Sequence, residues 1–212
     1  MVMSAGLVAG WYFWARHQNR ARAVQVLHWI EGALAGQGHV TGIRWRSASE
    51  FEVPIRMSST PFRKANIQVR FSPREFPLQW VLARLKRRRD PEMFTFQADL
   101  DLQPKFNMNM ISMRWFARSR KDLDTSDRGW EFGTGLPLVL TTRLDWQKEI
   151  TCAMQSLIGC EQRENLNLIF KKSSPHFSAT MPLESLSPDG GGAAFFQSLR
   201  AVVEGAAAKS SF

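Results

Sequence analysis

The sequence contains few of the side chains that bind metals or attack substrates, with two cysteines and four histidines among 212 residues. Cys152 and Cys160 are eight residues apart, about 12 Å along one predicted helix, which is too far for a disulfide between them. The pair also lacks metal-ligand spacing, which is typical of a reducing compartment. Cys152 belongs to the apolar pattern of that helix, so we expect a small buried residue rather than a nucleophile.

Catalytic motifs are absent from the sequence as well. It has no phosphate-binding glycine loop, dinucleotide-binding fingerprint or zinc spacing. The histidines lack Cys, Asp or Glu at ligand or triad spacing, so we expect them to be structural. They are His17, His28, His39 and His176. The sequence therefore predicts a noncatalytic protein without metal or cofactor, and leaves open an enzyme whose site the fold assembles from distant residues.

Acidic residues are fewer than basic ones, 19 against 28, which gives a net charge of +9 at pH 7. Such an excess favours anionic partners, which include lipid headgroups, nucleic acid and acidic proteins. Hydrophobic residues make up 44% of the chain and aromatic residues 11%. This composition excludes a disordered protein and suits one domain with a substantial core.

The N-terminal residues 2–15 carry no charge, end in an aromatic block, and are followed by arginines. An apolar run, aromatic residues and then cations is typical of a segment that contacts a bilayer. A cleaved secretory signal has its cations first, so we expect this anchor to be retained. Residues 1–19 are therefore predicted to be a membrane anchor with a basic flank. Its contact residues are Leu7, Val8, Trp11, Tyr12, Phe13, Trp14, Arg16 and Arg20.

This anchor is short for a single-pass transmembrane helix. Fourteen helical residues reach about 21 Å, against a hydrocarbon core of about 30 Å. The segment could lie in the interface, thin the bilayer, or continue a longer apolar segment that precedes Met1; its lack of a polar face favours the last. An apolar helix buried on the domain is the alternative. For a spanning segment, the arginines that follow it place the C-terminal domain in the cytoplasm.

Residues 20–208 are predicted to form one α+β domain, followed by a tail at 209–212. Its first helix, 20–35, is expected to end at Gly36, and strands 40–46 and 51–57 read as a hairpin. A third strand contains Ile67 and Phe71, and one face of this sheet is expected to be wet. Residues 72–142 are read as an insertion that begins with a short amphipathic helix.

That helix in the insertion ends in the densest run of cations in the sequence. It is either a second contact with an anionic membrane surface or a solvated helix end. The residues of this predicted contact are Trp80, Lys86, Arg87, Arg88 and Arg89.

The next strand, 94–102, has the clearest alternation of apolar and polar residues in the chain. Asp99 and Asp101 lie on one of its faces and could hold a hard cation, but no other ligand accompanies them, and a solvated face is the favoured interpretation. Further strands are expected at 108–118, around Phe132, and at 138–142.

The opening pattern then recurs, with a helix at 145–159, two strands joined by a serine turn, and a final helix whose stripe includes Phe195 and Leu199. The repeated helix-strand-strand unit resembles the secretion-chaperone-like superfamily of bacterial α+β domains. The pattern of elements predicts an antiparallel sheet with amphipathic helices on one face, and the resemblance implies a noncatalytic module that binds another protein.

Three functions remain open on the sequence alone. The first is a membrane-anchored cytoplasmic interaction module that binds a protein partner at an anionic membrane surface. The second is a nucleic-acid-binding domain, with aromatic and basic residues on a stacking sheet; its residues are Trp45, Trp115, Arg44, Arg70 and Arg114. The third is the enzyme with an assembled site.

Overall fold

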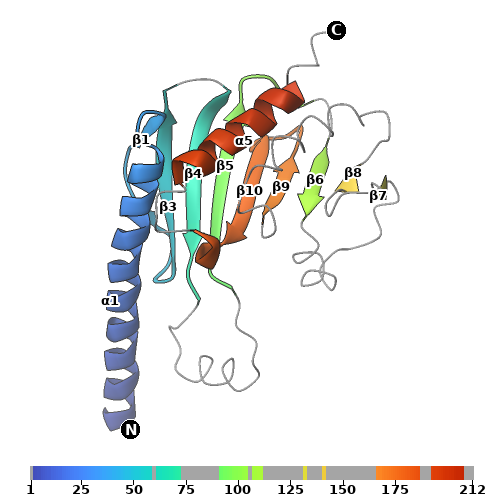
Figure 1. Cartoon of the computed structure of the whole chain (residues 1–212). Coiled ribbons are helices and arrows are strands. Elements are labelled where there is room, and N and C mark those ends of the chain that lie inside the picture. Colours follow the sequence, from blue (N-terminus) through green and yellow to red (C-terminus); the bar gives the residue numbers. More distant parts are fainter. Residues whose placement is uncertain are drawn as a thin grey trace.

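The computed structural model describes residues 2–58, 61–72, 91–104, 107–111, 131–132, 140–141, 166–186 and 192–207. These residues form an α+β fold in which a long antiparallel sheet carries two α-helices (Figure 1). The α+β class and the antiparallel sheet expected from the sequence are therefore confirmed.

The described part of the sheet has ten strands in the order β1-β3-β4-β5-β10-β9-β6-β8-β7, and β2 also pairs with β3. The strands are β1 Gly38–Val40, β2 Arg44–Trp45, β3 Glu50–Met57, β4 Phe62–Arg70, β5 Met93–Leu100, β6 Met108–Ile111, β7 Glu131–Phe132, β8 Leu140–Thr141, β9 Asn167–Phe170 and β10 Phe177–Pro182. The described helices are α1 Val2–Ala33, a 3₁₀ turn Leu183–Ser185, and α5 Gly192–Ala207.

One face of the sheet forms the core because the strands alternate with period two and their registers align. A buried row crosses five strands: Val53, Ile67, Phe96, Ala179 and Leu168. The neighbouring row on the other face is polar and half-buried: Glu52, Gln68, Thr95, Thr180 and Asn167. We call this second surface the polar sheet face.

Strand β5 is an interior strand of this sheet, between β4 and β10. Its Phe94 and Phe96 are fully buried, although both fall in the range 72–142 that the sequence marks as an insertion. Part of that range therefore contributes directly to the core of the domain.

Helix α1 is one continuous element, so the helix predicted at 20–35 and the N-terminal segment form a single helix. The buried residues of α1 lie along one face of the helix, because they are separated by three, four or seven positions. They are Ala15, Asn19, Ala23, Ile30 and Ala33. Three of them are alanines, whose small side chains allow a close approach to the sheet. The helix ends before Gly36, which has a φ of 80° that glycine adopts without strain.

No helix in the described part of the chain is long and apolar enough to cross a membrane. The predicted transmembrane helix is thus not found. Arg16, Arg20 and Arg22 interrupt the apolar run of α1. The second half of the helix, which follows them, covers the sheet.

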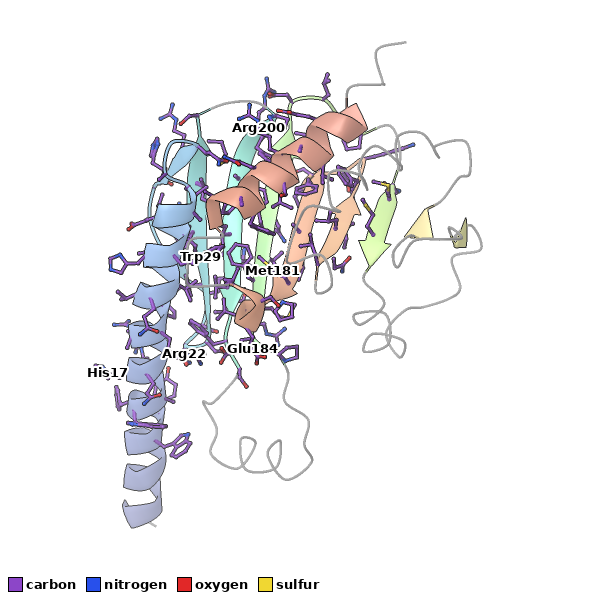
Figure 2. All side chains as sticks on the ribbon, in the orientation of Figure 1. His17, Arg22, Trp29, Met181, Glu184 and Arg200 are labelled. Carbon is purple, nitrogen blue, oxygen red and sulfur yellow. The ribbon has the colours of Figure 1, made fainter. Side chains whose placement is uncertain are left out.

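Helix α5 packs on the same face of the sheet as α1 (Figure 1). Its predicted apolar stripe is confirmed, and Phe195, Phe196 and Leu199 in it are buried. The Trp29 ring on α1 lies 5.8 Å from the Phe94 ring and 6.5 Å from the Phe196 ring, so it joins both helices to β5 (Figure 2 labels Trp29).

The first residue of α5 lies so close to α1 that only glycine fits. A Cβ on Gly192 would lie 2.4 Å from the Ala33 Cβ and 3.1 Å from the Trp29 ring. Gly192→Ala is expected to lower the free energy of unfolding by about 2 kcal/mol, because the two helices must separate. Gly32→Ala is the matched control, since a Cβ there meets nothing within 4 Å and alanine favours the helix. Urea denaturation of both variants checks this, and equal midpoints would contradict it.

Several sequence-based predictions lie outside the described residues. They concern Trp80 and the cations at 86–89, the strand beyond residue 111, the helix at 145–159, and both cysteines. The repeated unit stays a prediction, because its second helix belongs to this group.

Candidate functional site

The N-terminal half of α1 projects past the end of the sheet (Figures 1 and 2). Three of its aromatic side chains are accessible: Tyr12 is 37% exposed, Phe13 64% and Trp14 49%. We call residues 11–14 the aromatic segment. Four consecutive residues point in all directions around a helix, so the segment has no polar side.

The arginines that follow the aromatic segment differ in their surroundings. Arg22 donates to both carboxylate oxygens of Glu92, at 2.6 and 2.5 Å, and its guanidinium lies over the Phe71 ring at 5.3 Å. It is therefore a structural residue and not part of a solvated basic flank. Within the described part of the chain, neither Arg16 nor Arg20 pairs with a carboxylate, and both are exposed.

A surface cleft of about 260 Å³ lies between α1 and the turn that joins β2 to β3. We call it the cationic cleft. Its lining residues are Tyr12, Arg16, Arg20, Trp45, Arg46, Ser47 and Ala48. The cleft is somewhat smaller than the pockets that enclose drug-sized ligands, and it suits a small polar group.

Two contacts hold the wall of the cleft against α1. Asn19 is buried in the helix face and donates from Nδ2 to the Ala48 carbonyl at 3.1 Å. The Arg20 guanidinium lies over the Trp45 ring at 5.9 Å, and Trp45 packs on Phe51 with ring centres 5.2 Å apart. An asparagine at an otherwise apolar position of the stripe is thus explained by the turn that it anchors.

The β2–β3 turn also supplies polar groups to the cleft. The Ser49 N–H donates to Ser47 Oγ at 3.2 Å, and the two serine hydroxyl oxygens lie 3.4 Å apart, so that either can donate to the other. Arg46 Nε lies 2.7 Å from a carboxylate oxygen of Glu52. One of the three arginine charges is thereby offset, whereas no described carboxylate offsets those of Arg16 and Arg20.

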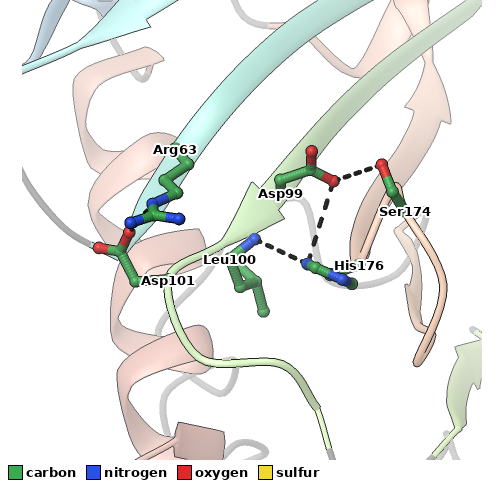
Figure 3. A network of polar contacts seen from close by, with 6 residues as sticks. All are labelled: Arg63, Asp99, Leu100, Asp101, Ser174 and His176. Carbon is green, nitrogen blue, oxygen red and sulfur yellow. Dashed lines mark hydrogen bonds and ion pairs between the residues drawn. The ribbon is translucent and has the colours of Figure 1, made fainter.

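A second cluster joins the ends of β5 and β10 (Figure 3). Ser174 donates to Asp99 Oδ1 at 2.6 Å, and the Leu100 N–H donates to His176 Nδ1 at 3.2 Å. The sequence spacing does not reveal this group, because the residues are far apart in the chain and meet only across the strand pair.

The cluster has the residue types of a Ser-His-Asp triad but not the geometry. In a triad the serine hydroxyl bonds to the imidazole and the carboxylate bonds to the Nδ1 hydrogen. Here Ser174 bonds directly to Asp99, and His176 Nδ1 is an acceptor that lies 4.0 Å from the carboxylate. The hydrogen bonds of this cluster therefore tie the β9–β10 turn to the end of β5.

The predicted pair of carboxylates on β5 does not form a cation site. Asp99 bonds to Ser174, whereas Asp101 lies past the strand end and pairs with Arg63 at 2.8 Å (Figure 3). Among the described residues, no group of three or more His, Cys, Asp or Glu side chains is placed to hold a metal ion.

The structure thus brings together Tyr12, Arg16 and Arg20 from the predicted anchor, and adds Trp45 from β2 and Ser47 from the β2–β3 turn. The side chains of Leu7 and Val8 are not among those described. No family model matches this chain, and no curated protein matches it in sequence.

Proposed function

We propose that this protein is a noncatalytic interaction module that attaches to an anionic membrane surface and binds another protein there. The observation that carries the proposal is the aromatic segment, which projects from the domain beside two arginines that have no carboxylate partner among the described residues. Large aromatic side chains in water favour transfer to the membrane interface, where their amphipathic rings are stabilised.

The spacing along α1 supports this attachment. Arg16 and Arg20 follow Tyr12 by four and eight residues, or about 6 and 12 Å along the axis. The polar layer of a bilayer is roughly 5 to 8 Å thick on each side. Aromatic rings at the boundary of the hydrocarbon therefore put the arginines among or just above the headgroup phosphates.

The cytoplasmic leaflet is the proposed surface, because it is rich in anionic lipids and attracts each nearby cation by about 1 kcal/mol. The net charge of +9 has the matching sign. The two cysteines without a disulfide spacing agree with a reducing compartment.

The polar sheet face is the proposed contact for the protein partner. One uncharged polar row spans β4, β5, β10 and β9 through Gln68, Thr95, Thr180 and Asn167. Side chains of this kind form hydrogen bonds without the desolvation cost of charges. The resemblance to secretion-chaperone-like domains, which bind proteins, agrees with this part of the proposal.

Vesicle co-sedimentation tests the attachment. The full chain is expected to bind phosphatidylcholine vesicles that contain phosphatidylserine more tightly than pure phosphatidylcholine vesicles. The variant Phe13→Ala/Trp14→Ala is expected to bind about 100-fold more weakly, because two large apolar side chains together supply about 3 kcal/mol.

The control is Val24→Ala/Ile43→Ala, which removes two exposed apolar side chains away from the aromatic segment. It is expected to bind like the unchanged chain. Equal losses in both variants, or no vesicle binding at all, would contradict the proposal. Strongly salt-dependent binding to RNA or DNA instead would favour the nucleic-acid alternative.

One structural observation weakens that alternative. Trp45 pairs with Phe51 and so lies on the helix-covered side of the sheet, whereas Arg70 pairs with Glu50 on the polar sheet face. Cross-strand partners point to the same side of a sheet. Trp45 and Arg70 therefore do not share one stacking surface.

A further inference from the structure

The cationic cleft has a charge surplus that a specific class of ligand would satisfy. Arg16, Arg20 and Arg46 line it, and among the described carboxylates Glu52 offsets only Arg46. Arg16 and Arg20 therefore leave a positive charge of about two in the cleft. The Arg20 guanidinium is held over the face of the Trp45 ring. Neighbouring guanidinium groups without an acidic partner in the described structure are typical of a site for a multiply charged anion.

We propose that the cationic cleft binds a phosphomonoester, presented by a lipid headgroup. A phosphomonoester carries a charge of about −1.5 to −2 at pH 7 and three acceptor oxygens. The phosphodiester of an ordinary phospholipid carries a single charge and fewer free oxygens. The surplus in the cleft therefore matches the monoester. This proposal rests on the membrane attachment proposed above.

The cleft offers hydrogen-bond donors to a phosphate from two elements, α1 and the β2–β3 turn. Arg16 and Arg20 approach from α1, and guanidinium groups bind phosphate oxygens through paired N–H donors. The Ser47 hydroxyl approaches from the β2–β3 turn, with its oxygen already accepting the Ser49 N–H. Asn19 is a positioning residue, because its bond to the Ala48 carbonyl fixes that turn against the helix.

The place of the cleft favours a lipid over a soluble phosphate compound. Tyr12 belongs both to the cleft lining and to the aromatic segment. A headgroup in the cleft would thus have its acyl chains on the side where exposed aromatic rings enter the interface. Successive turns of α1 thus supply the residues of both contacts.

Binding to two kinds of anionic vesicle with matched surface charge tests this proposal. One contains phosphatidic acid, whose headgroup is a phosphomonoester, and the other contains phosphatidylserine. The full chain is expected to bind phosphatidic acid vesicles about tenfold more tightly. Arg16→Gln/Arg20→Gln is expected to abolish this preference, and Arg16→Lys/Arg20→Lys to keep general binding but reduce the preference, because lysine lacks the paired donors.

The matched control is Arg56→Gln/Arg70→Gln, which removes two exposed arginines outside the cleft and changes the net charge equally. It is expected to keep the tenfold preference. If both double variants lose binding alike, or if the two vesicles bind equally, the cleft proposal fails while the membrane attachment stands. All these residues are exposed, and circular dichroism checks that each variant folds.

Titration with soluble glycerol 3-phosphate separates the two sources of the phosphate. Competition by this compound, lost in Arg16→Gln/Arg20→Gln, supports the cleft as the phosphate site. If it binds through these arginines while no vesicle binds, the phosphomonoester site stands and the membrane attachment fails. Absence of both kinds of binding overturns both proposals.

Discussion

Phe96→Ala is expected to lower the free energy of unfolding by about 4 kcal/mol, near the upper end of the range for truncating a core side chain. Phe96 is fully buried in the interior strand β5. Its ring lies 5.3 Å from Phe62 and 5.4 Å from Phe196, so it joins the end of β4 to α5. Alanine would leave a cavity that strand pairing on both sides of β5 prevents from closing.

Denaturation by guanidinium measures this loss, with the same substitution at Phe13 as the control. Phe13 is an exposed phenylalanine on the projecting end of α1, so Phe13→Ala is expected to change stability by less than about 0.5 kcal/mol. A loss below about 2 kcal/mol for Phe96→Ala would contradict the described packing. A large loss for Phe13→Ala would show that the aromatic segment is part of the core.

Arg22→Ala is expected to cost about 3 kcal/mol, at the low end of the range for breaking a buried ion pair. The Glu92 side chain is only 11% exposed, and it would keep its charge without the two hydrogen bonds from Arg22. The variant also loses the contact of the guanidinium with the Phe71 ring. Arg22 itself is 37% exposed, which places the cost at that lower end.

A double-mutant cycle isolates this interaction. The losses of stability in Arg22→Ala and in Glu92→Gln are expected to sum to more than the loss in Arg22→Ala/Glu92→Gln, because the double variant loses the shared pair of hydrogen bonds only once. Arg63→Ala is the control, since Arg63 and Asp101 form an exposed pair whose loss costs less than about 1 kcal/mol. Equal effects of Arg22→Ala and Arg63→Ala would contradict a structural role for the Arg22–Glu92 pair.

The strands can be predicted where their side chains alternate. Strands β3, β4, β5 and β10 each carry an apolar residue at every second position over most of their length, and the structure buries those positions. A strand that packs one face on a core has an apolar side chain at every second position, so neighbouring residues are sufficient to predict it. The stripe of α5 is predictable for the same reason, with a period of three to four.

The N-terminal segment shows where local patterns are insufficient. Residues 2–15 have the composition of an anchor, but the same helix runs on to Ala33 and joins the core through Ala23, Ile30 and Ala33. Alanines at a helix–sheet contact give a weak apolar signal. Whether a helix ends at a membrane or continues into a domain depends on contacts with strands far along the chain.

The cationic cleft can be predicted only in part. The cations at Arg16 and Arg20 are visible in the sequence, but Trp45 and Ser47 belong to a different element, and only the hairpin geometry places them opposite the helix. The role of Arg22 cannot be predicted, because its partner Glu92 is 70 residues away. Long-range ion pairs leave no periodic signal in a sequence.

By itself the sequence determined the alternating strands β3, β4, β5 and β10, the apolar stripe of α5 and the excess of positive charge. These properties depend on side-chain period and composition, which neighbouring residues set. The tertiary structure alone decided that Arg22 is held in an ion pair while Arg16 and Arg20 line a cleft, and that Asp99, Ser174 and His176 meet without forming a triad. Those outcomes depend on strand order and register, because pairing between distant segments fixes which side chains come within hydrogen-bonding distance.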